Sequence, residues 1–168
     1  MDKIRNKVKE SGLITMDLAE FKPSLGMIGI DIADQLWQGL ALKEKDFRAW
    51  VKDHDWHSYS GEAVFVHCSA DAIIPTWAFM LIGSKLEEAG VSYIIGNADE
   101  LTQRLILDQI QNIELTDYVD GRVIIKGCSD IPNPEFAMSE LVRKLQPVVK
   151  SIMYGEPCST VPIFKRKG

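Results

Sequence analysis

Residues 59–69, YSGEAVFVHCS, and residues 118–129, YVDGRVIIKGCS, are two versions of one local pattern. The two tyrosines are 59 positions apart and the two cysteines 60, so the second version has one extra residue. Each version has a turn, a short apolar run of β-branched residues and a Cys-Ser pair where that run stops. We interpret the two segments as the same local structure formed twice, a turn followed by a strand that ends at the edge of a sheet.

Helical patterns separate the strands that follow. Residues 63–66, 91–95 and 122–126 are apolar runs typical of strands, and each is followed by an amphipathic stretch. Pro75 opens the first helix and Gly90 ends it. Asn97 and Glu100 form a capping box at the start of the second, and Asn133 with Pro134 starts the third. This alternation predicts an α/β fold, a single three-layer domain over residues 1–168 with a mostly parallel sheet and helices on both faces.

The beginning of the chain adds shorter elements. Residues 2–11 have the spacing of an amphipathic helix, residues 13–16 and 27–32 are expected to be strands, and residues 43–52 a helix. Residues 53–57, DHDWH, have the composition of metal ligands, but such charge runs are usually solvated loops, and we expect a loop.

Composition limits the classes of function. The chain has 168 residues, enough to bury a core, and its net charge is -5, which argues against a general nucleic-acid surface. Its basic cluster, residues 165–167, is expected to be a solvated tail. Without an apolar run long enough for a membrane span, and without a signal peptide, a cytoplasmic protein with reduced thiols is expected.

The three cysteines are the candidate site. Cys68, Cys128 and Cys158 are each followed by serine, and a proline comes soon after each pair. In open parallel sheets, ligands bind beyond the carboxyl ends of the strands. If the strands that precede Cys68 and Cys128 are neighbours, their thiolates are close enough to share one metal ion.

Cys158 reaches the same edge only if Pro147 breaks the third helix and residues 148–154 form a fourth strand. Otherwise it would belong to a partner subunit's site. We favour the strand, and a homodimer is left open.

Three thiolates predict either zinc with an open fourth position or an iron–sulfur cluster with one differentiated iron. Such a site could serve an enzyme whose small-molecule substrate completes the coordination. The candidate fourth ligands are Glu156, Asp71, Asp130 and His67. Ser69, Ser129 and Ser159 are expected to donate hydrogen bonds to the thiolates. Asp71 and Asp130 are also candidates for a catalytic acid and base, with helix capping as the alternative.

Two other classes of function stay open. One is a non-enzymatic interaction or regulatory domain whose cysteines are structural, because free cysteine is often a buried packing residue. The other is a thiol redox protein. No Cys-x-x-Cys motif, glycine-rich phosphate loop or nucleophile elbow is present.

Four segments resemble one known family. They are CSADAIIPTWA (68–78), KGCSD (126–130), SIMYGEPCSTVP (151–162) and QGLALKEKDFR (38–48). Together they are similar to the bacterial domain-of-unknown-function family 2480. The resemblance covers nearly the whole chain and implies a small stand-alone protein. It implies no activity and no catalytic residues.

Overall fold

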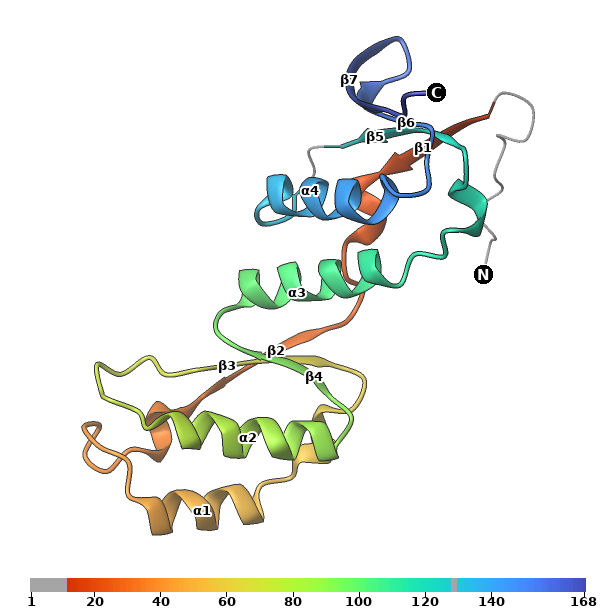
Figure 1. Ribbon diagram of the computed structural model, residues 1–168. Helices are drawn as coiled ribbons and strands as arrows, with labels where there is room; N and C mark the ends of the chain where they lie inside the picture. Colours follow the sequence, from red (N-terminus) through yellow and green to blue (C-terminus); the bar gives the residue numbers. More distant parts are fainter. Residues whose placement is uncertain (1–11, 128–129) are drawn as a thin grey trace. The chain divides into compact units, whose positions relative to one another are not determined.

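The computed structural model describes residues 12–127 and 130–168, which divide into two compact units (Figure 1). Unit 2 is residues 24–104. Unit 1 combines residues 12–23 with the described residues from 105 to 168. The expected helix over residues 2–11 lies outside the described residues. The prediction of one domain over residues 1–168 stays a prediction.

Unit 2 is built on a three-stranded parallel sheet. Its strands are β2 (Met27–Asp31), β3 (Ala63–His67) and β4 (Ser92–Ile95), with β3 in the centre. Helices α1 (Glu44–Asp53) and α2 (Thr76–Glu88) lie on the same side of this sheet (Figure 1). Their buried side chains share one core with the sheet, formed by Ile30, Val64 and Val66 from the strands and Phe47, Val51, Ile82 and Leu86 from the helices.

Unit 1 is built on a four-stranded sheet in the order β1-β5-β6-β7. Strands β1 (Leu13–Asp17), β5 (Arg122–Lys126) and β6 (Ser151–Glu156) are parallel, and β7 (Ser159–Lys165) returns antiparallel along β6. Helix α4 (Pro134–Leu145) and the last part of α3 (Ala98–Gln111) form one core with this sheet. Its buried residues include Val123, Ile125 and Ile152 from the strands and Ile106, Ile110, Leu141 and Leu145 from the helices.

The two units follow one plan at a constant offset of 59 residues. Ala63 pairs with Ser92 in unit 2, and Arg122 pairs with Ser151 in unit 1. The core helix residues match as well, in the pairs Phe47 and Ile106, Val51 and Ile110, Ala78 and Ala137, Ile82 and Leu141, and Leu86 and Leu145, all of them buried. The repeated pattern of the sequence therefore extends over a whole helix–strand–helix–strand segment.

Local sequence explains where the helices begin and end. Asn97 and Glu100 form the expected capping box, with Glu100 N donating to Asn97 Oδ1 and Asn97 N donating to Glu100 Oε2. Asn133 caps α4 by accepting from Phe136 N. Helix α4 ends at Leu145, ahead of Pro147, so the predicted break is confirmed.

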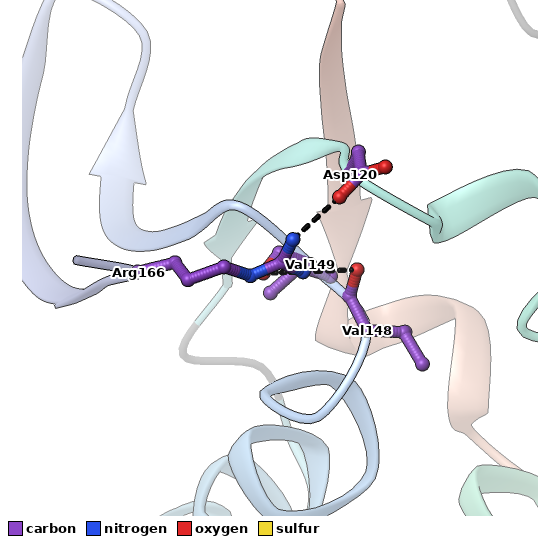
Figure 2. Close-up of polar contacts among 4 residues, drawn as sticks. All are labelled: Asp120, Val148, Val149 and Arg166. Atoms are coloured by element: carbon purple, nitrogen blue, oxygen red, sulfur yellow. Dashed lines mark hydrogen bonds and ion pairs between the residues drawn. The ribbon is translucent and has the colours of Figure 1, made fainter. Parts of the chain in front are cut away.

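Lys165, Arg166 and Lys167 are all exposed, as expected of a solvated tail, but the Arg166 side chain is also held by hydrogen bonds. Figure 2 shows Arg166 donating hydrogen bonds to the carbonyl oxygens of Val148 and Val149, both at 2.8 Å, and pairing with Asp120. These carbonyls lie in the loop that leads into β6. One guanidinium thus ties the end of β7 to the start of its neighbouring strand.

The α/β class and the mostly parallel strand pairing are confirmed. The strands divide between two sheets, however, where one sheet was expected. The reason is that each Cys-Ser strand has its own neighbour from the start of the chain, β2 for β3 and β1 for β5. Local apolar patterns identify strands but do not specify their partners.

Candidate functional site at the carboxyl edges of the two sheets

The carboxyl edge of the unit 1 sheet gathers charged side chains. Strand β5 ends at Lys126 and the adjacent parallel strand β6 ends at Glu156, with Lys126 Nζ 3.8 Å from Glu156 Oε2. Cys158 lies in the turn between β6 and β7 and is exposed. Cys128 follows β5 by two residues and lies outside the described residues. The fourth-strand prediction, which brought Cys158 to this edge, is confirmed.

Asp17 ends β1 and adds a carboxylate to the same edge. Its Oδ1 accepts a hydrogen bond from Ala19 N at 2.9 Å and starts a short 3₁₀ helix. Gly127 lies so close that a Cβ there would come within 2.7 Å of Asp17 Oδ1, and its φ is +101°. Both observations require glycine directly before Cys128.

Glu20 brings a third carboxyl group to this edge. Partial desolvation and the nearby Asp17 raise the pKa of Glu20, while Lys126 opposes them. Lys126 therefore interacts electrostatically with two carboxyl groups, those of Glu20 and Glu156.

The carboxyl edge of the unit 2 sheet has a related arrangement around Asp31. Asp31 ends β2, and its Oδ1 accepts from Ala33 N at 2.9 Å and from Ser69 N at 3.0 Å. Hydrogen bonds from the Ser69 side chain and from these two amides lower the pKa of Asp31 to about 2. The aspartate thus fixes the start of the loop that carries Cys68.

Cys68 and Cys128 do not follow neighbouring strands. Cys68 follows β3, whose neighbours are β2 and β4, whereas Cys128 follows β5, whose neighbours are β1 and β6. The expected adjacency of these two strands is therefore wrong. Cys68 is half-buried, and its Sγ donates to the carbonyl oxygen of Ala70 at 3.6 Å. His67, its neighbour, stacks on Phe65.

Asp71 and Asp130 are both exposed and come after strands of different sheets. Because their strands belong to different sheets, the strand order gives no reason to expect them as a pair at one edge. Their roles as acid and base stay predictions. The alternative of helix capping is wrong for both. The residue before α2 is Pro75, and the residue that caps α4 is Asn133.

The serines differ in their surroundings. Ser69 hydrogen bonds to Asp31, a partner that the sequence did not suggest. Ser159 is exposed and opens β7 opposite Glu156. Ser129 lies outside the described residues.

Among residues 12–127 and 130–168, no three His, Cys, Asp or Glu side chains are grouped as metal ligands. This finding does not cover Cys128, which lies outside the described residues.

Asp53, Asp55 and His57 are exposed, as expected of a solvated loop, but His54 and Trp56 pack inward. Trp56 is buried and donates from Nε1 to the carbonyl oxygen of Val51. The His54 ring contacts both the Trp50 and the Trp56 rings, and its Nε2 is 2.7 Å from the Tyr59 hydroxyl. Desolvation lowers the pKa of His54. Aromatic packing, which a charge count cannot detect, decides the conformation here.

Asp17, Asp31 and Lys126 were missed by reasoning from sequence. A detectable signal existed, because both aspartates stand at the end of a strand and precede an apolar residue and an alanine, as DLA and DIA. That order is typical of an aspartate whose side chain accepts from the amide two residues on.

No helix in the described part of the chain has the length and apolarity needed to cross a membrane. No curated protein and no solved structure shows significant similarity to this sequence. The sequence profile of a family described as protein of unknown function (DUF2480) matches residues 2–166, and the chain belongs to that family.

Proposed function

We propose that the chain binds a transition-metal ion, zinc or iron, at the carboxyl edge of the unit 1 sheet, with Cys128, Cys158 and Glu156 as ligands. One observation carries the proposal. Strands β5 and β6 are parallel neighbours in register, and each cysteine follows its strand by two residues. Both thiol-bearing segments therefore start at the same edge of one sheet.

The spacing suits a shared ion. Neighbouring strands are about 4.8 Å apart, and thiolates that share a tetrahedral zinc are about 3.8 Å apart. Thiolate and carboxylate donors together match the ligand preferences of zinc and iron. Asp17, whose carboxylate lies against Gly127, is an additional oxygen donor at this edge. Lys126 would partly balance the negative charge of such a ligand set.

The number of thiolates distinguishes the two metal alternatives. A mononuclear ion needs only the donors of the unit 1 edge. An iron–sulfur cluster is usually held by four thiolates, and Cys128 and Cys158 supply two, so a cluster would require cysteines of a second chain.

The test is metal content in three single variants, with protein purified anaerobically and without an affinity tag. For a mononuclear site, Cys128→Ser and Cys158→Ser lose the metal, and the matched control Cys68→Ser keeps it. Iron and sulfide in the wild type, lost in Cys128→Ser and in Cys158→Ser, support the cluster. Equal metal content in the wild type and all three variants, or none after reconstitution, contradicts the proposal. Far-UV circular dichroism confirms that each variant is folded.

A thiol redox function is the second candidate, because Cys158 is exposed in a turn while Cys68 is half-buried. It predicts that iodoacetamide labels Cys158 of the folded, metal-free protein much faster than Cys68. Labelling of Cys158 no faster than that of an unfolded control peptide argues against this function.

A further inference from the structure

An apolar cavity opens between α4 and the β6–β7 hairpin of unit 1. Its volume is about 160 Å³, and its walls include Met138 and Val142 of α4, Ile152 and Tyr154 of β6 and Ile163 of β7. Two lining residues have a hydroxyl group, Ser139 and Tyr154, and the Ser139 hydroxyl already donates to the carbonyl oxygen of Phe136 at 2.8 Å. The other lining side chains are apolar, so the cavity offers mainly apolar contact.

Unit 2 shows how the same space is filled in the other copy of the plan. At the constant offset of 59 residues, Val142 corresponds to Gly83 and Ile152 to Tyr93. The Tyr93 ring lies over Gly83, and a Cβ on that glycine would come within 2.6 Å of the phenol oxygen. Unit 2 thus places an aromatic ring of its own between helix and strand where unit 1 has a cavity.

We propose that this cavity receives an aromatic side chain from an extended segment of a partner protein. An engineered apolar cavity of about 150 Å³ in another protein binds benzene, so the volume suits one ring. The exposed side chains beside the cavity, Tyr154 (41%), Ile163 (52%) and Val161 (57%), offer more apolar surface than one ring can cover. Aromatic anchors in pockets are typical of the centres of protein interfaces.

The charges beside the cavity specify the partner further. Two depressions of the surface adjoin the cavity. Glu135 lines one of them and Arg143 lines the other. These residues are eight apart on one helix, a distance of about 12 Å along its axis. An extended segment spans that distance in about four residues. The partner segment therefore has an aromatic residue with a basic residue two positions to one side and an acidic residue two positions to the other.

The first experiment uses p-cresol, the side chain of tyrosine, and methionine-methyl NMR. Met138 and Met153 line the cavity, whereas Met80 is exposed on α2 of unit 2 and serves as the internal control. We expect saturable shifts of the Met138 and Met153 signals and none for Met80. The double variant Val142→Gly/Ile152→Tyr copies the unit 2 residues and should abolish the shifts. If it fails to fold, Ser139→Trp fills the cavity from an exposed helix position.

The second experiment uses the peptide acetyl-Lys-Ala-Tyr-Ala-Glu-amide. It should bind at least about tenfold more tightly than p-cresol, and Arg143→Ala should reduce that gain. No shifts in the wild type, or equal shifts in the filled variants, overturns the proposal. Binding of p-cresol with no gain for the peptide also overturns it, because the cavity would then be a small-molecule site.

Discussion

Units 1 and 2 share a helix–strand–helix–strand segment but differ in their other features. The shared part is the core, where residues 59 apart are buried in both units, as with Ile82 and Leu141 or Leu86 and Leu145. Among the described residues, unit 2 has the Tyr93 ring over Gly83 and the packed loop around His54. Unit 1 has strand β7, the turn with Cys158 and the open cavity at the position that Tyr93 fills in unit 2. Residues common to both units therefore specify the fold, and the features of unit 1 that lack a counterpart are where function is to be sought.

The matched core leucines test this comparison with the largest expected effect. Leu86 and Leu145 are both fully buried, at 0% exposure. Leu86→Ala and Leu145→Ala should each lower the free energy of unfolding by about 3 kcal/mol through lost burial and a residual cavity. Urea denaturation measures both. A loss below about 1 kcal/mol for one of the two would show that the units do not rest on equivalent cores.

Tyr93→Ala converts the filled site of unit 2 into one like that of unit 1. We expect a loss of about 2 kcal/mol, less than for a fully buried ring because Tyr93 is only partly buried. The variant should also gain thermal stabilisation by p-cresol beyond that of the wild type. Tyr93→Phe is the control, because it keeps the ring. If p-cresol stabilises the alanine variant and the wild type equally, removal of the Tyr93 ring does not open a cavity large enough to bind p-cresol.

Arg166→Ala addresses β7, which unit 2 lacks. Removing the bonds to the Val148 and Val149 carbonyls should cost about 1 kcal/mol, because they are charge-assisted but partly exposed. Hydrogen exchange should quicken for β7 amides and stay unchanged for β3 amides. Lys165→Ala, one residue earlier and exposed, is the control. Uniform quickening in both units would instead indicate that Arg166 contributes only to global stability.

Asp31→Asn has the smallest effect and a distinctive pH dependence. The pKa of Asp31 is lowered from 3.8 to about 2, so its charge stabilises the folded state above about pH 4. That contribution is lost as pH falls from 4 toward 2. The free energy of unfolding of the wild type should therefore exceed that of the variant by about 1 kcal/mol at pH 6 and by less near pH 2. Asp17→Asn is the matched variant in unit 1. A gap that widens on acidification would contradict the role of Asp31.

Local features of the fold were predictable because they depend on neighbouring residues. The strand at residues 122–126, the Asn97–Glu100 capping box and the break at Pro147 follow from apolar runs, hydrogen-bonding side chains and proline geometry. The division into two sheets was not predictable, because β1 and β2 have similar apolar patterns and nothing local says which of β3 and β5 each one joins.

The candidate site was predictable in the same partial way. Cys158 was placed at the carboxyl edge of β6 correctly, because only the break at Pro147 and the strand after it were needed. The grouping of Cys68 with Cys128 depended on long-range strand pairing and is not found. The roles of Asp17 and Asp31 depend on turns that form only when their strands end in the sheet.

The most direct test is chemical cross-linking of Cys128 to Cys158 in the folded Cys68→Ser variant. A short bis-maleimide, followed by proteolysis and mass spectrometry, reports whether the two thiols lie near one another. The parallel pairing of β5 and β6 predicts one intrachain cross-linked peptide in high yield, independent of protein concentration and lost on unfolding in urea. Only singly labelled cysteines, or a cross-link that forms only between chains, would contradict the placement of both cysteines at one sheet edge and with it the proposed metal site.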